Sequence, residues 1–171
     1  MPKVTIVPLG DISEDLLTFV SAELREQFGV MTETLLSVDL PKGMFNAIRQ
    51  QYPSPLVLKF LSEKFPGRVL GITDQDLYAE SLNFVFGQAY FNGKVAVISI
   101  HRLNPTFYKQ KPNTKILITR AVKEAVHEVA HNFGLDHCQD VKCVMSFSNT
   151  VGDVDRKNKD LCRPCQLKLS V

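Results

Sequence analysis

The sequence predicts an α/β fold in which helices cover a twisted, mixed sheet. The chain opens with a strand-like run, a helical pattern and a second strand-like run, an order that favours parallel strands. Farther on, Asn92-Gly93 joins two extended runs, and this dipeptide is typical of a hairpin, so one antiparallel pair is expected. The chain has 171 residues, 44% hydrophobic and 22% charged, which predicts a single globular domain over residues 1–171.

Short-range signals define the first three elements. Residues 3–9 are apolar enough for a buried strand. Asp11 or Ser13 can cap the helix that follows, and Gly29 can end it. The apolar positions of this helix recur every four residues, at Leu16, Val20, Leu24 and Phe28. Residues 30–40 are predicted to form the second strand.

Two helices are expected in the next part of the chain. Residues 44–52 fit a short helix. Ser54-Pro55 then supplies a cap and a first-turn proline for a longer helix, which Pro66-Gly67 stops. The longer helix has an apolar face made of Leu56, Val57, Phe60, Leu61 and Phe65.

The central strands follow. Residues 69–72 form the third predicted strand, and residues 73–76 are interpreted as the turn that ends it, although their oxygens could instead bind a cation. Residues 84–91 and 94–101 are the two arms of the hairpin, and a type I′ turn is predicted between them.

A long amphipathic helix is predicted to begin near Thr114, after a loop over residues 104–113. One stripe of this helix is apolar and comprises Ile118, Val122, Ala125 and Val129. The roughly opposite stripe comprises Arg120, Glu124, His127 and His131. The first stripe is expected to pack under the sheet and the second to face a cleft. His101 lies outside this pattern and is interpreted as structural or solvated.

Residues 127–138 carry the strongest functional signal. His127 and His131 stand four apart, so on a helix both rings can reach one metal ion. Glu128 lies beside them, where a carboxylate can accept a proton from a metal-bound water. Gly134 lets the helix stop with positive φ, and His137 then returns toward the same ion. Three imidazoles and one open position predict a catalytic zinc site, and solvated histidines on a polar helix face are the alternative.

All four cysteines lie near the C-terminal end, at Cys138, Cys143, Cys162 and Cys165. Two short-spaced pairs separated by a loop are typical of a structural zinc site. Two disulfides are one alternative, which is unexpected in a chain without a secretory signal. A redox pair at Cys162 and Cys165 is the other, but such a pair normally opens a helix after a βαβ strand. The sequence therefore predicts two Zn²⁺ ions, one catalytic and one structural.

These motifs resemble those of the metzincin clan of zinc peptidases, and more narrowly the archaemetzincin family. The resemblance rests on the histidine motif, on His137-Cys138, on Cys143-Val144-Met145 and on Cys162-Arg163-Pro164-Cys165. It implies a metzincin-like catalytic domain with an N-terminal part over residues 1–134. A small zinc-stapled part would follow over residues 135–171. It also implies zinc-dependent hydrolysis of a peptide or protein substrate, with Glu128 as general base.

The resemblance assigns further roles. It implies that Met145 forms the turn beneath the catalytic metal, although a plain core methionine fits equally well. Some metzincins have a tyrosine ligand two residues past that methionine, but Phe147 cannot bind zinc. Metzincins bind substrate along an antiparallel edge strand, which here would be residues 84–91. Gly87, Gln88 and Ala89 are the candidate substrate-binding residues, and an ordinary hairpin arm is the alternative.

Composition and length argue against several other classes. The net charge of +2 is too small to suggest nucleic acid or an anionic membrane as a partner. The start of the chain is not a signal peptide, and no apolar run reaches transmembrane length. A cytoplasmic monomer without a pro-segment is therefore expected.

Two other functions compete with peptide hydrolysis. One is a zinc-stabilised peptide-binding module with little or no proteolytic activity. The other is a zinc hydrolase acting on nucleic acid, because some bacterial ribonucleases use three histidines at a similar spacing. Those enzymes lack a glutamate after the first histidine, so Glu128 favours the peptidase.

Overall fold

The main sheet is mixed and has its antiparallel strand at one edge. The computed structural model describes residues 1–169, so the last two residues of the predicted C-terminal part lie outside it. Five strands follow the order β2-β1-β4-β8-β7, and all neighbours are parallel except β7 and β8. They are β1 (Lys3–Leu9), β2 (Met31–Thr34), β4 (Arg68–Thr73), β7 (Gly87–Ala89) and β8 (Val95–Ser99). The predicted α/β class with a twisted, mixed sheet is confirmed.

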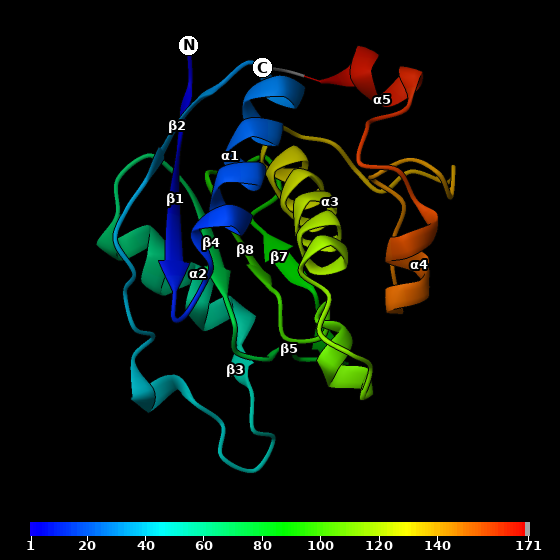
Figure 1. The fold of residues 1–171 in the computed structure, drawn as a ribbon. Coiled ribbons are helices and arrows are strands. Elements are labelled where there is room, and N and C mark those ends of the chain that lie inside the picture. The colour runs from blue at the N-terminus through cyan, green and yellow to red at the C-terminus, as the bar shows by residue number, and fades with distance from the viewer. Residues whose placement is uncertain (170–171) are drawn as a thin grey trace.

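Helices cover both faces of this sheet (Figure 1). The helices α1 (Glu14–Phe28) and α3 (Thr114–Asn132) lie side by side on one face, and α2 (Ser54–Lys64) lies on the other. Val97 and Ile98 are neighbours on β8, so their side chains point to opposite faces and enter different hydrophobic cores. The core on the α3 side is the larger one, and it supports the helix that carries the histidines.

The predicted ends of α1 and α3 are confirmed by their caps. Ser13 Oγ accepts a hydrogen bond from the N–H of Leu16 at 3.2 Å, and Gly29 ends α1 with φ 63°. Asn113 Oδ1 caps α3 by accepting from the N–H of Ile116 at 3.1 Å. Gly134 follows α3 with φ 90°, the positive value that its glycine was predicted to provide.

The predicted strand over residues 84–91 is divided between two sheets. Its first part belongs to a small sheet of order β3-β5-β6, made of β3 (Tyr52–Pro53), β5 (Leu77–Ala79) and β6 (Leu82–Val85). Its second part is β7. The predicted type I′ turn is wrong, because Asn92 has φ 54° but Gly93 does not adopt positive φ. The N–H of Asn92 instead donates to the carbonyl of His131 at 2.9 Å, which ties the hairpin tip to the end of α3.

Three further expectations are corrected. The second strand ends at Thr34 rather than at residue 40. Residues 44–52 form no helix but a turn that follows the 3₁₀ segment η1 (Lys42–Met44) and is closed by a bridge between Asn46 and Gln51. Ser54 does not cap α2, since its hydroxyl donates to the carbonyl of Tyr78 at 3.1 Å.

The segment after α3 contains two short helices, α4 (Val151–Arg156) and α5 (Arg163–Lys168), while the 3₁₀ segment η2 (Pro105–Tyr108) precedes α3. The helix α4 lies beside α3 (Figure 1), and polar contacts join the two helices. Arg120 pairs with Asp155 at 2.8 Å, and Lys123 Nζ donates to the carbonyl of Val154 at 3.0 Å. Within residues 1–169, no helix combines the length and apolar character needed to cross a membrane.

Candidate active site

Three histidine rings converge where α3 meets the segment that follows it. The Nε2 atoms of His127 and His131 lie 3.2 Å apart. His137 adds a third ring nitrogen, and the three nitrogens lie within 4.8 Å of one another. Nδ1 of His127 lies 2.8 Å from the carbonyl oxygen of Val144, and Nδ1 of His131 lies 2.7 Å from that of Leu135. A carbonyl can only accept, so each Nδ1 donates and each Nε2 keeps a lone pair for a metal.

These rings suit a zinc ion in both spacing and protonation state. Two nitrogens bound to tetrahedral zinc at about 2.0–2.1 Å would lie about 3.3 Å apart, close to the observed separation. Burial is the largest effect that lowers the pKa of His127, His131 and His137, and the nearby Lys157 ammonium lowers each pKa further. The rings are therefore neutral at pH 7, which is the form that binds metal.

Glu128 lies against the glycine of the edge strand. A Cβ added to Gly87 would lie 2.9 Å from Glu128 Cγ and 2.7 Å from the carbonyl oxygen of Val97. Burial raises the pKa of the Glu128 carboxyl well above its usual range, and the neighbouring Glu124 raises it further. Because Gly87 has no side chain, the Glu128 carboxyl has room to lie between α3 and β7.

We expect Gly87→Ala to lower kcat without loss of the histidine-bound metal. The new methyl group cannot move away from the Val97 carbonyl, so Glu128 must shift. A displacement of a catalytic group by about 1 Å can cost about a hundredfold in rate. Peptide turnover and zinc content of the variant check this, with Gly43→Ala as control because a Cβ there meets nothing within 4 Å. Unchanged turnover of Gly87→Ala would contradict the prediction.

A cleft of about 480 Å³ joins the histidines to the edge strand. Its aromatic lining comprises Phe84, Phe86, Phe91 and Phe147, and its polar lining includes Glu124, Glu128, Ser148 and Asn149. The predicted substrate-binding residues Gly87, Gln88 and Ala89 also line it. The side chain of Gln88 is held from α2, because its amide lies within hydrogen-bonding distance of Ser54 Oγ.

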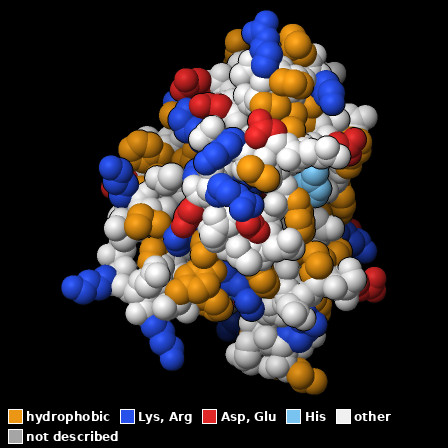
Figure 2. Space-filling view, turned by 90° about the vertical axis from the view of Figure 1, so that its right-hand side faces the viewer, with side chains coloured by type: hydrophobic (Ala, Val, Ile, Leu, Met, Phe, Trp, Pro, Cys, Tyr) orange, Lys and Arg blue, Asp and Glu red, His pale blue; other side chains and the backbone are white. Residues whose placement is uncertain are grey.

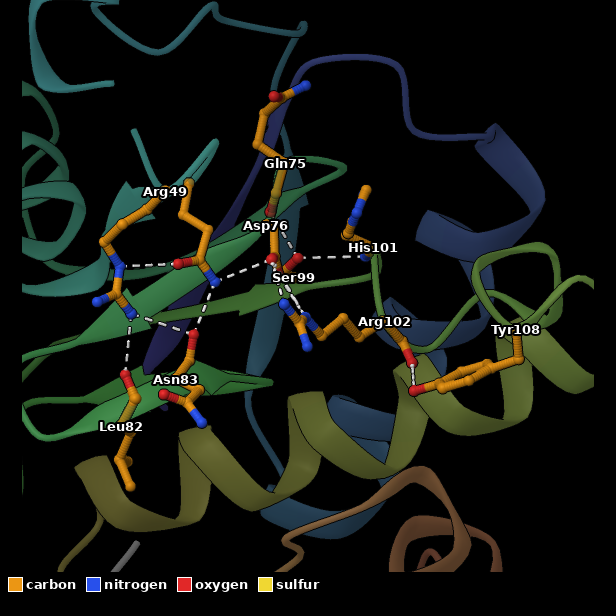
Figure 3. A network of polar contacts seen from close by, with 10 residues as sticks. Arg49, Gln75, Asp76, Leu82, Asn83, Ser99, His101, Arg102 and Tyr108 are labelled. Carbon is orange, nitrogen blue, oxygen red and sulfur yellow. Dashed lines mark hydrogen bonds and ion pairs between the residues drawn. The ribbon is translucent and has the colours of Figure 1, made fainter. Parts of the chain in front are cut away.

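A polar network fixes the outer wall of the cleft (Figure 3). Asp76 accepts from Nε and Nη2 of Arg102 at 2.9–3.1 Å. Arg49 donates to the carbonyls of Leu82 and Asn83 at 3.1 and 3.2 Å, which anchors β6. The Arg102 guanidinium also lies 4.3 Å from the ring centre of Phe84, a residue of the cleft wall. Residues 73–76 therefore form part of this network, as the predicted turn.

The four cysteines form a second cluster. Sγ of Cys138 lies 3.8 Å from Sγ of Cys162, and Sγ of Cys143 lies 3.8 Å from Sγ of Cys165. All four thiols are free, and their sulfur atoms lie within 4.8 Å of one another. Four thiolates at about 2.3 Å from a tetrahedral zinc would lie about 3.8 Å apart, so the cluster fits this ion.

The cysteine cluster and the histidines share one short segment. The N–H of Cys138 donates to the carbonyl of Met145 at 2.9 Å, and the carbonyl of Val144 holds the ring of His127. Met145 is fully buried in the core beside α3. The segment that carries Cys143 therefore orients His127 as well.

Lys157 is the main site-adjacent residue that sequence reasoning missed. Its side chain is fully buried, and Nζ lies 3.1 Å from Glu124 Oε1. No sequence signal distinguishes it from the surface lysines around it.

On the side that carries α4 and α5, acidic and basic side chains are interspersed, and a small exposed patch of histidine borders hydrophobic side chains (Figure 2).

The comparisons with known proteins agree along almost the whole chain. The sequence model of peptidase family M54 matches residues 19–171. The archaemetzincin of Methanocaldococcus jannaschii is 46% identical over 167 residues, covering 98% of this chain and 92% of that protein. The archaemetzincin of Pyrococcus furiosus is 39% identical and covers 97% and 91%.

Solved structures show the same fold. The archaemetzincin of Archaeoglobus fulgidus, complexed with malonate, superposes with a TM-score of 0.85 at 37% identity and covers 98% of this chain and 99% of that one. The archaemetzincin of Methanopyrus kandleri gives 0.86 at 36% identity and covers 97% and 92%. With three neutral imidazoles, a buried glutamate and a thiol cluster in place, the chain belongs to peptidase family M54, the archaemetzincins, and is a zinc metallopeptidase.

Proposed function

We propose that the chain hydrolyses peptide bonds in this cleft, with His127, His131 and His137 holding a catalytic zinc ion and Glu128 acting as general base. The observation that carries the proposal is the convergence of three imidazole nitrogens beside a buried carboxyl in one cleft. Zinc bound by these rings supplies a Lewis acid that acidifies water and polarises the scissile carbonyl.

Glu128 carries the proton through the reaction. It accepts a proton from the attacking water and later donates it to the leaving amine. Burial raises the pKa of its carboxyl, which suits a group that must hold a proton near neutral pH between the two steps. Gly87 keeps this carboxyl at the cleft floor.

The open side of β7 supports a substrate lying beside it as an added strand. Tyr90 donates to the carbonyl of Val95 at 3.0 Å, and Ser99 donates to that of Phe86 at 2.8 Å. Antiparallel pairing alternates, so Gln88 also faces β8 while the backbone groups of Gly87 and Ala89 point to the open edge. An extended peptide could use these groups for main-chain hydrogen bonds.

We expect Ala89→Pro to weaken peptide binding more than it weakens the fold. The N–H that proline removes points away from β8, so the sheet keeps its hydrogen bonds while the added strand loses one. KM should rise by about tenfold while Tm changes little, as one lost hydrogen bond predicts. A peptide complex with the ligand away from β7 would contradict this placement.

We also expect two zinc ions per chain, one on the histidines and one on Cys138, Cys143, Cys162 and Cys165. Chelator should remove the first ion before the second, because an open three-histidine site binds zinc less tightly than a closed thiolate site. Elemental analysis before and after mild chelation checks both the count and the order. Loss of the thiolate-bound ion first would contradict the assignment.

A peptide library tests the proposed function directly. Zinc-loaded protein should cleave part of a diverse library, and the products identify the cleaved bond. Binding without cleavage would favour the alternative, a zinc-stabilised peptide-binding module. The cytoplasmic location, the monomeric state and the lack of a nucleic-acid or membrane partner stay predictions from the sequence.

A further inference from the structure

A buried glutamate stands one helical turn before the metal ligands, and the proposed mechanism does not use it. Glu124 is 3% exposed and borders the cleft that contains the histidines. It precedes His127 by three residues and His131 by seven, so all three side chains project from the same face of α3. In other metalloproteins, the helical spacing Glu-x-x-His supplies a carboxylate and an imidazole to one metal centre. By its position, Glu124 is therefore a candidate metal ligand.

A second carboxylate at the metal would change the chemistry of the site. A catalytic zinc ion keeps one position open for water, whereas a zinc ion with four protein ligands is typical of a structural site. The three histidine nitrogens lie within 4.8 Å of one another, and no oxygen of Glu124 belongs to this set. The fold therefore holds the Glu124 carboxylate apart from the three nitrogens.

Lys157 is the residue that holds this carboxylate. Its Nζ lies 3.1 Å from Glu124 Oε1, and both side chains are buried. The same Nζ donates to the carbonyl of Ser146 at 3.3 Å, which ties it to the turn that follows Met145. Because the Lys157 side chain is fully buried, its ammonium cannot turn to water and stays paired with the carboxylate. The ion pair both restrains Glu124 and offsets its charge.

We propose that Lys157 is a positioning residue that keeps Glu124 from binding the catalytic metal and so preserves the open position for water. A buried carboxylate is stable only beside a cation or a metal ion. While the ammonium is in place, Glu124 needs no other partner. Without it, an ion on the histidines of the same helix face becomes the alternative partner. The inference rests on the proposed zinc site at His127, His131 and His137.

The zinc affinity of the histidine site tests this role without any substrate. Loss of a buried residue that only supports the fold should weaken metal binding, whereas loss of Lys157 should strengthen it. In Lys157→Met, the dissociation constant for zinc at the histidines should fall by about tenfold, the lower end of the effect that a neighbouring opposite charge has on proton binding. Competition with a chromophoric chelator measures this constant while the cysteine cluster stays loaded. An unchanged or weaker affinity would overturn the proposal.

The gain in affinity should depend on the glutamate. Adding Glu124→Gln to Lys157→Met removes the freed carboxylate and should return the zinc dissociation constant to the wild-type value. Lys123→Met is the matched control, because Lys123 is also buried between α3 and α4, whereas its Nζ donates to the carbonyls of Val154 and Asp155. This control should not strengthen zinc binding. A gain that survives in the double variant, or that appears in Lys123→Met, would overturn the proposal.

Cobalt at the histidines, with zinc kept on the cysteines, reports on the ligands directly. The visible absorption of Co²⁺ depends on the number and kind of its ligands. The spectrum of Lys157→Met should therefore differ from that of wild type, and the spectrum of the double variant should match wild type. The same spectrum in wild type and Lys157→Met would overturn the proposal.

Lys157→Gln keeps the test decisive if Lys157→Met does not fold. Glutamine removes the charge but retains an N–H donor for the Ser146 carbonyl, so it should change zinc affinity and cobalt spectrum in the same direction. Neither measurement needs turnover. Wild-type protein that binds no metal at the histidines would refute the proposed active site and this inference with it. Bound metal with wild-type affinity in both Lys157 variants would refute only the role of Lys157.

Discussion

Glu128→Ala is expected to abolish peptide hydrolysis while the protein keeps both zinc ions. The three histidine nitrogens can hold a metal ion without this carboxyl, so its removal should take away proton transfer and not ligation. General acid–base catalysis contributes about 10²–10⁴-fold, and turnover should fall by at least that factor. Initial rates on a verified peptide, beside zinc content, check the prediction.

The variant should remain folded, which makes the loss of activity interpretable. Glu128 is buried, and burial raises the pKa of its carboxyl, so the ionised side chain costs stability in the native protein. Replacing it should leave Tm unchanged or raise it. Glu63→Ala on the exposed surface of α2 is the control and should keep full activity. Wild-type turnover in Glu128→Ala would refute the assignment of the general base.

Local signals predicted the elements that hold the site. The four-residue spacing of His127 and His131 needs only a helix, and the apolar stripe on α3 predicts that helix. Ser13, Gly29 and Gly134 act through the backbone next to them, so their roles could be predicted without knowledge of the fold.

The second strand is shorter than expected because of its neighbour β1, which the apolar pattern of the second strand cannot reveal. Pro8 on β1 has no N–H to donate, so the ladder between β1 and β2 ends near Ile6 and Thr34. The chain still runs beside β1, because Val38 donates to the carbonyl of Pro8 at 2.9 Å. An apolar run therefore became an irregular segment rather than a strand.

The expected helix over residues 44–52 failed because turn chemistry outweighed periodicity. Asn46 Oδ1 accepts from the N–H groups of Ile48 and Arg49, both at 3.1 Å, which closes a turn. Gln50 has φ 57°, which no regular helix contains. Ile48 is 97% exposed, so its apolar side chain had no core to enter.

The buried pair of Lys157 and Glu124 could not be predicted from sequence. The two residues are far apart along the chain, and neither spacing nor composition marks a lysine that will be fully buried. Their contact depends on how α4 docks on α3, which Arg120 and Lys123 help to set. The burial of this pair is therefore a property of tertiary structure.

The cysteines are expected to matter more for the fold than the histidines do. Within the described part, residues 138–169 contain two six-residue helices and no strand, so regular hydrogen bonding contributes little there. A thiolate zinc site contributes its binding free energy to folding, on the order of 10 kcal/mol in zinc-finger peptides. The effect should be smaller here, because the sheet and its helices have their own cores.

Cys162→Ser should loosen residues 138–169 and, through them, the catalytic site. The Val144 carbonyl that holds the His127 ring lies next to Cys143, so the histidine-bound zinc should also be lost in part. A loss of about 2 kcal/mol would lower Tm by about 4–8 °C. His131→Ala is the matched variant and should leave Tm nearly unchanged, because apolar packing on the sheet holds α3 without the ion.

Hydrogen exchange distinguishes the two variants by region. In Cys162→Ser, protection should fall over residues 138–169 and persist in the sheet, since each part draws its stability from a different source. In His131→Ala, protection over residues 138–169 should match wild type, because the thiolate site keeps its ion. Wild-type protection of this segment in Cys162→Ser would show that the cysteine cluster does not support the fold. His127 would then owe its orientation to the buried packing of Val144 and Met145 alone.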